Sequence, residues 1–577
     1  MEKNKQNNLR QNMTSERKGR NDAALKTPSK TSGKGRGSNF LIQGSILAVA
    51  GIIVRLIGMV YRIPLINIIG KEGSGYYTAA YDIYVILLII SSYSLPTAVS
   101  KMVAAKLGKG EYKNSERILK TALWYATIAG GIGAIILGFG AEPLADLLRM
   151  PYCKYALAAF APTIWIMAYL GVLRGYFQGT GNMVPTAISQ ILEQIVNAVI
   201  SIVAATYLFA KGLAANAVHD SEHYAHAYGA AGGTIGTGSG ALAAFLFFLL
   251  LFWLYRPVMR RQRRKDKTRR LDSYGHIAMV MTATIVPIVL SSAVYNVSAV
   301  IDNYFFSHGM EKLGHMDEIA AQWGTFGQYH LLFNIPVAIS NALSSSLIPS
   351  LTRAVAARDR KQTLEKVQIA IRFSMIIAIP SAVGLCVLSG PINNLLFSGD
   401  DNALLIKITM AGALAVVFFS LSTVSNAILQ GINRMNIPMR NAAIALFVHV
   451  AALEVMLLVF KWGLYSVVFA NIVFSFLMCQ LNAASIRKYL HYRQEIKKTF
   501  LIPTIASLIM GAAAYGVYHL IYKLCHINAA GAGGAILAAV AVYGILLIKL
   551  GCIDENELKK MPGGTRLLGA ARKLHLM

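Results

Sequence analysis

Two arginines lie inside the first long apolar stretch of the sequence. Arg55 and Arg62 are seven residues apart, and seven residues at 100° each return to nearly the same face of a helix. Gly44, Gly51 and Gly58 repeat with the same period on a neighbouring face, and glycine stripes mark close helix packing in membranes. We therefore expect both guanidinium groups to face the protein interior, where they suit the bidentate binding of a phosphate or carboxylate.

Three carboxylates also fall inside apolar stretches, where an ionisable group is costly unless it is paired or faces water. Asp82 and Asp302 lie near the outer ends of their stretches. We expect each to pair with an arginine. For Arg62, the alternatives to binding an anionic substrate are an ion pair with Asp82 and extension of its side chain to the lipid headgroups. Asp302 could instead bind a coupling ion or a proton. Glu193 is either a proton or cation site or a hydrogen-bonding partner of a neighbouring helix.

The elements that must position these side chains are membrane-spanning helices. Of the 577 residues, 55% are hydrophobic and 14% are charged, whereas about 25% are charged in soluble proteins. The apolar runs are continuous, which excludes a β-barrel. With roughly 20 residues needed per crossing, they predict an all-α polytopic protein with about fourteen spans, near 40–63, 76–100, 118–140, 155–177, 184–209, 229–254, 277–305, 323–349, 371–390, 408–429, 438–460, 463–484, 499–521 and 529–550.

The distribution of positive charge predicts the orientation in the cytoplasmic membrane. The net charge is +28. With both termini inside, the cytoplasmic connections hold 28 lysine and arginine residues and the opposite connections hold eight, as the positive-inside rule requires. The run Arg260–Arg270 is then expected to meet anionic membrane lipids, and nucleic acid is not a predicted partner. Residues 1–38 are polar and basic, which is typical of a disordered cytoplasmic tail.

The sequence repeats itself at a spacing of 252 to 253 residues, which predicts two parallel lobes of six spans each, a layout typical of transporters. Three pairs of motifs carry the repeat: Gly75-Tyr76 and Gln328-Tyr329; Leu95-Pro96 and Ile348-Pro349; Gln178-Gly179 with Asn182 and Gln430-Gly431 with Asn433. Pro96 and Pro349 are candidate hinges, because proline breaks a helix. The predicted divisions are the tail 1–38, an N-lobe 39–255, a basic cytoplasmic linker 256–274, a C-lobe 275–490, two extra helices 491–551 and a cytoplasmic tail 552–577.

No motif indicates catalysis or a cofactor. The five cysteines are scattered without metal-binding spacing, so no metal site is predicted, and the GxxxxGK[ST] motif of an ATPase does not occur. The connections are too short for the outward catalytic domain of a membrane glycosyltransferase, which argues against an enzyme. His449 and Glu454 are interpreted as satisfied polar groups of the core.

Several motifs together resemble a known family. Arg55-Leu-Ile-Gly-Met-Val-Tyr-Arg62-Ile-Pro, Gln178-Gly-Thr-Gly-Asn-Met-Val-Pro185 with Glu193-Gln194, and Pro336–Pro349 look like segments of polysaccharide flippases of the multidrug/oligosaccharidyl-lipid/polysaccharide (MOP) superfamily. The stage V sporulation protein B type, related to MurJ-type lipid II flippases, is the nearest group. The likeness covers roughly residues 39–550.

This resemblance implies a fourteen-helix, two-lobed carrier that moves an undecaprenyl-pyrophosphate-linked glycan to the outer leaflet by alternating access. First-span arginines line the cavity of MurJ-like proteins; Arg55 stands at the matching place and Arg62 is shifted by one residue. Leu331, beside His330, replaces a further cavity arginine. The two extra helices would hold the lipid tail, and cell-wall synthesis enzymes are candidate partners. The alternatives are a drug/cation antiporter of the same superfamily and a non-transporting envelope or sporulation scaffold.

Overall fold

The computed structural model describes residues 33–268, 270–397 and 402–552, which are helical and contain no strand. The predicted tails fall mostly on residues 1–32 and 553–577, which lie outside the described residues. The helices of the first half are α2 (Gly33–Leu88), η1 (Ile89–Tyr93), α3 (Leu95–Leu107), α4 (Tyr112–Phe139), α5 (Ala141–Leu147), η2 (Pro151–Cys153), α6 (Lys154–Gly179), α7 (Val184–His219) and α8 (His223–Lys265). Those of the second half are α9 (Tyr274–Lys312), η3 (Met316–Glu318), α10 (Ile319–Ala356), α11 (Arg360–Val387), α12 (Ser389–Leu396), α13 (Ala403–Gly431), α14 (Asn436–Glu454), η4 (Val455–Val459), α15 (Leu464–Leu490), η5 (Lys497–Leu501), α16 (Ile502–Cys525) and α17 (Asn528–Lys549).

The prediction of about fourteen membrane crossings is confirmed. Twelve described segments are long and apolar enough to span a bilayer. One of them, Val49–Leu107, contains two crossings, because α2 kinks at Gly70, where φ is 72° and glycine is favoured. The shorter apolar helix Tyr274–Leu290, which is the first part of α9, adds another. The chain is an all-α, multi-pass membrane protein.

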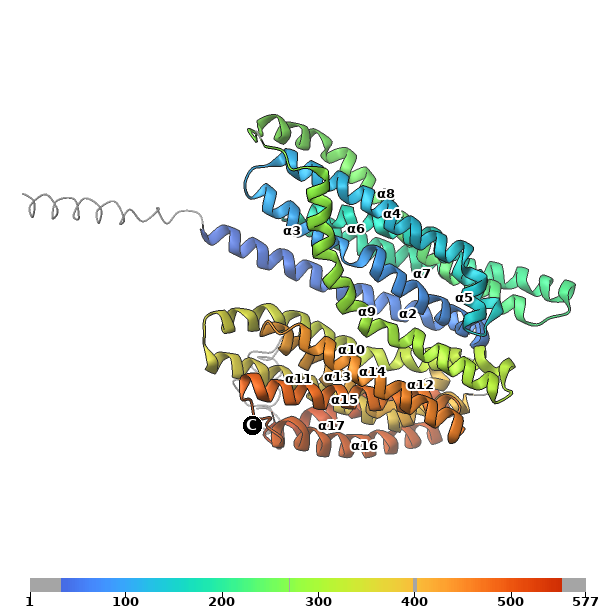
Figure 1. The fold of residues 1–577 in the computed structure, drawn as a ribbon. Coiled ribbons are helices and arrows are strands. Elements are labelled where there is room, and N and C mark those ends of the chain that lie inside the picture. The colour runs from blue at the N-terminus through green and yellow to red at the C-terminus, as the bar shows by residue number, and fades with distance from the viewer. Residues whose placement is uncertain (1–32, 269, 398–401, 553–577) are drawn as a thin grey trace, which may run out of the picture.

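The helices gather in two groups (Figure 1), as the sequence repeat predicts. We call α2 to α8 the N-lobe and α10 to α15 the C-lobe; α16 and α17 pack beside α11 and α12. Helix α9 runs from one group to the other. Its first half buries Ile277, Met281 and Ile285 in a cluster shared with the N-lobe and contacts α3 and α4, and its second half contacts α14. The first helix of the second repeat therefore belongs to both lobes.

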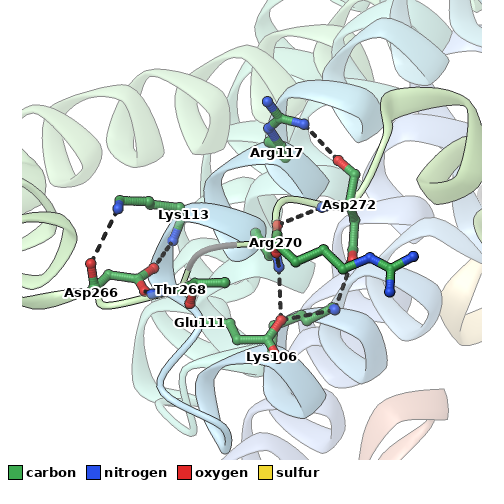
Figure 2. Close-up of polar contacts among 9 residues, drawn as sticks. Lys106, Glu111, Lys113, Arg117, Asp266, Thr268, Arg270 and Asp272 are labelled. Atoms are coloured by element: carbon green, nitrogen blue, oxygen red, sulfur yellow. Dashed lines mark hydrogen bonds and ion pairs between the residues drawn. The ribbon is translucent and has the colours of Figure 1, made fainter.

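The segment between α8 and α9 is docked on the N-lobe (Figure 2). Helix α8 continues to Lys265, so much of the predicted basic linker is helical. Asp266 accepts a hydrogen bond of 2.6 Å from the backbone N–H of Lys113. Lys106 forms ion pairs with Glu111 at 2.9 Å and with Asp272 at 2.5 Å. These contacts fix the point at which α9 begins. We call this end of the molecule the linker end, and the opposite end the far end.

The two lobes touch at the far end, where α2 meets α10 without intervening side chains. A Cβ added at Gly75 would lie 1.9 Å from the carbonyl oxygen of Ala320, and one at Gly324 would lie 1.8 Å from that of Lys71. No side chain larger than hydrogen fits at these separations, so the helices approach at two glycines. The structure is therefore closed at the far end.

Candidate functional site at the lobe interface

The two first-span arginines lie on α2. Arg55 is exposed, and its Nη1 lies 3.4 Å from the carbonyl oxygen of Ala338 on α10. The guanidinium of Arg62 lies 4.8 Å from the ring centroid of Tyr81 and 5.8 Å from that of Tyr77, within the range of a cation–π contact. Within the described residues, neither arginine forms an ion pair with a carboxylate. Both positive charges are therefore available to an anion.

The glycine stripe does not have the expected role of bringing α2 close to a neighbour. A Cβ at Gly51 would meet nothing within 4 Å. One at Gly58 would lie 2.9 Å from the side-chain nitrogen of Gln194, which is a flexible amide and not a helix backbone. The surroundings of Gly44 lie outside the described part of the chain. The close glycine contact of α2 is made instead beyond the kink, at Gly75.

Four ionisable side chains from three helices interact near the point where the lobes meet. The charge of Asp302 on α9 repels that of Asp82 on α2, and Arg62 attracts Asp82. His330 on α10 interacts with Asp302 and Arg62. Asp82 forms no ion pair among the described residues, so the predicted pairing with Arg62 is a longer-range attraction. We call Arg62, Asp82, Asp302 and His330 the interface cluster.

Asp302 is paired with a histidine and an asparagine instead of an arginine. It is buried, contacts Nε2 of His449 through Oδ1, and accepts a 3.2 Å hydrogen bond from Asn471. The other ring nitrogen of His449 lies 2.8 Å from the carbonyl oxygen of Ala470. A carbonyl only accepts, so that nitrogen carries a proton. A second proton must then lie between Nε2 and the carboxyl group, either as imidazolium and carboxylate or as neutral imidazole and acid.

Glu193 stands in a half-buried ion pair inside the N-lobe. Its carboxylate lies 2.6 Å from Nη2 of Arg174, whose Nε donates a 3.1 Å hydrogen bond to Ser189. Arg174, at the end of the predicted span 155–177, was one of the 28 basic residues counted in the cytoplasmic connections, but it lies within α6 and is 9% exposed. Of the two roles considered for Glu193, this geometry favours the contact with a neighbouring helix.

The repeated glutamine motifs end equivalent helices, α6 and α13. The backbone carbonyl of Gln178 accepts a hydrogen bond from the N–H of Gly181, and that of Gln430 accepts one from Asn433. Gly181 has φ of 88° and Asn433 has φ of 66°, a left-handed conformation that glycine and asparagine tolerate. The structure therefore matches Asn433 with Gly181 and not with Asn182. The side chain of Asn182 instead accepts a hydrogen bond from the N–H of Val184.

The two candidate hinge prolines differ in the helical structure that surrounds them. Pro96 begins α3 directly after the π-helical segment Ile89–Tyr93, so span two is broken near its middle. Pro349 lies inside the continuous helix α10. Only the N-lobe proline stands at an interruption of its helix.

Comparison with known proteins finds two family models and several full-length relatives that match this chain. The family model described as "Polysaccharide biosynthesis protein" matches residues 41–307, and the model described as "MatE" matches residues 287–456. The chain is 25% identical to stage V sporulation protein B of Bacillus subtilis (strain 168), over 92% of this chain and 99% of the relative. It is 26% identical to lipid II flippase MurJ of the same organism, over 91% of this chain and 98% of the relative.

Solved structures show the same fold. Lipid II flippase MurJ in an inward closed conformation matches with a TM-score of 0.61 at 17% identity, over 87% of this chain and 97% of that one. A multidrug resistance MATE family transporter in an inward-facing conformation matches with a TM-score of 0.56 at 15% identity, over 76% and 98%. These relatives are flippases and transporters and not enzymes. The chain carries a polysaccharide biosynthesis protein domain followed by a MatE domain, is homologous to stage V sporulation protein B and MurJ, and has the fold of MurJ and the MATE transporters.

Proposed function

We propose that the protein is a flippase that moves an undecaprenyl-pyrophosphate-linked sugar, either lipid II or another polysaccharide precursor, across the cytoplasmic membrane. The linker end would face the cytoplasm, because the basic connections lie there. The substrate would enter from that side, reach the interface between the lobes and leave after the far end opens. The homology to MurJ and stage V sporulation protein B supports a lipid-linked precursor as the transported molecule.

The observation that carries the proposal is the pair of arginines at the lobe interface, neither of which has a carboxylate partner in the described part of the chain. An unpaired cation at membrane depth is costly unless it faces water or an anion. Arg55 contacts α10 only through a carbonyl oxygen, and Arg62 rests on two tyrosine rings. Both guanidinium groups can therefore hold a pyrophosphate by charge-assisted hydrogen bonds. The proposed role of α16 and α17 is to keep the polyprenyl chain in lipid.

The test is mass spectrometry of undecaprenyl-linked species in cells depleted of the protein and rescued with variants. We expect one intact lipid-linked glycan to accumulate, the parent chain to clear it and Arg55→Ala to leave it uncleared at a normal membrane level. Arg360→Ala is the matched control, because it removes an exposed arginine at the start of α11 and should behave like the parent.

Two outcomes would contradict the proposal. If no lipid-linked glycan accumulates on depletion, transport of such a lipid is not the function, and drug export and scaffolding become the activities to measure. If the glycan accumulates but Arg55→Ala and Arg62→Ala both clear it, the arginines do not bind the pyrophosphate. The identity of the accumulated glycan names the substrate in the expected case.

A further inference from the structure

An open groove of about 710 Å³ lies between α4 and the beginning of α9, away from the lobe interface. Leu123 and Trp124 line it from α4, and Tyr274, Gly275 and Ala278 line it from α9. Its volume is in the range of ligand sites, roughly 300–1,000 Å³. Apolar atoms form most of its surface, so an alkyl chain fits the lining better than a polar ligand does.

The groove opens toward the acyl chains of the bilayer. Trp124, Ile128, Ile132 and Ile135 follow one another at intervals of three or four residues along α4, and their exposed fractions run from 55% to 69%. Met279, which follows the groove residue Ala278 on α9, is 63% exposed. Because an apolar stripe of this length in a multi-pass membrane protein faces lipid, lipid molecules reach the groove directly.

The linker-end rim of the groove carries excess positive charge. Arg117 holds its guanidinium 4.9 Å from the ring centroid of Tyr274 and donates to a backbone carbonyl of the segment before α9. Lys120, which also lines the groove, lies 3.0 Å from Glu116, and Arg263 lies 3.3 Å from the same carboxylate. Lys120 and Arg263 therefore share one carboxylate, and Arg117 forms no ion pair with a carboxylate among the described residues. A cationic rim above an apolar lining complements an anionic headgroup with an acyl chain.

We propose that this groove binds one anionic phospholipid of the cytoplasmic leaflet. The phosphate would lie at Arg117 and Lys120, and an acyl chain would lie against Trp124, Tyr274 and the bare backbone at Gly275. The indole and phenol rings stand at the level where aromatic side chains gather at a membrane interface. The proposal rests on the orientation given above but not on the transport of a lipid-linked sugar.

Such a lipid would brace the helix that belongs to both lobes. The groove is formed by α4 and the first turns of α9, and the other face of these turns buries Ile277 and Met281 in the N-lobe. Farther along, Asp302 ties the same helix to His449 of the C-lobe. A lipid held between α4 and α9 therefore stabilises the packing of α9 on the N-lobe. Anionic lipid should accordingly raise the melting temperature of the purified protein more than a zwitterionic lipid does.

The test is native mass spectrometry of the full-length protein in detergent, with phosphatidylglycerol or phosphatidylcholine added at equal concentration. We expect the parent to retain one phosphatidylglycerol in preference to phosphatidylcholine. Replacing Arg117 and Lys120 by glutamine removes two interfacial cations and should lower this preference roughly 30-fold. The matched control is Lys361→Gln, which removes one exposed cation at the same end of the molecule and should keep the preference.

A second variant fills the groove without changing its charge. A Cβ added at Gly275 meets nothing within 4 Å, so Gly275→Trp can place its ring in the groove without a backbone clash. It should reduce the retention of both lipids while the protein keeps its melting temperature in lipid-free detergent. Equal retention of the two lipids by the parent, or undiminished phosphatidylglycerol binding in both groove variants, would overturn the proposal. Arg55→Ala should retain lipid normally, so a failure of the flippase proposal leaves this readout unaffected.

Discussion

The far-end contact between α2 and α10 should control which end of the protein is closed. A Cβ introduced by Gly324→Ala would lie 1.8 Å from the carbonyl oxygen of Lys71. Ordinary van der Waals contact begins at 3.4 Å, so the helices must separate by about 1.6 Å at this point. Overpacking of this kind costs roughly 1–3 kcal/mol. Only the state that is closed at the far end has this contact between α2 and α10. The equilibrium between the closed and open states should therefore shift toward the open state by about 5- to 150-fold.

The assay is the labelling rate of a cysteine at the contact by a membrane-impermeant maleimide added from the outside. Thr78→Cys is suitable, because Thr78 lies against Gly327 on α10, and peptide mass spectrometry separates its signal from that of the five native cysteines. Gly324→Ala should speed the labelling. Gly384→Ala is the control, because a Cβ there meets nothing within 4 Å. Equal labelling rates in both variants and the parent would refute the assignment of the far-end contact as a gate.

Two further predictions concern buried and linker contacts. Arg174→Met should lower the stability by about 1–3 kcal/mol, because it leaves the half-buried Glu193 carboxylate without its cation; Arg174→Met with Glu193→Gln should recover part of the melting temperature in detergent, and no recovery would contradict the pairing. For Asp266, burial raises the pKa, but hydrogen bonds from Thr268 and Lys113 outweigh it, so the pKa lies below its usual value. A lowered pKa stabilises linker docking above the unfolded value of about 3.9, and the effect is lost only as pH falls through the folded value. Thermolysin cleavage between α8 and α9 should therefore be constant from about pH 5 to pH 8 and faster in Asp266→Asn; cleavage that rises markedly toward pH 5 would contradict this.

The fold was largely predictable because membrane helices have a strong sequence signal. Continuous apolar runs and the 252- to 253-residue repeat indicated the spans and the two groups of helices. The kink at Gly70 was not predicted, since a polar stretch between two apolar runs reads as a loop. The dual packing of α9 also could not be read from the chain, because it depends on contacts with α4 and α14 that are remote in sequence.

The sequence indicated which ionisable residues belong to the candidate site, but it did not indicate which residues pair with them. Ionisable residues within spans are rare enough to single out Arg62, Asp302 and Glu193. Their partners were not predicted, because His449 is 147 residues from Asp302, and Arg174 was assigned to a connection when helix ends were uncertain. Burying a charged side chain is costly unless it is paired with an opposite charge or hydrogen-bonded. The sequence does not indicate which neighbouring helix supplies that partner.

The interface cluster offers a physical reason why an anion would favour opening at the far end. A ligand shifts a conformational equilibrium only by its difference in affinity for the two states. Arg62 and Asp82 both lie in the N-lobe, whereas Asp302 lies on α9 and is tied to the C-lobe through His449. In the closed structure a pyrophosphate at Arg62 is repelled by both carboxyl groups. Parting the lobes removes the repulsion from Asp302 and leaves the attraction of Arg62 unchanged, so we expect the anion to bind more tightly to the separated state. The proton shared by Asp302 and His449 reduces this difference, because the pair carries no net charge in either arrangement of the proton.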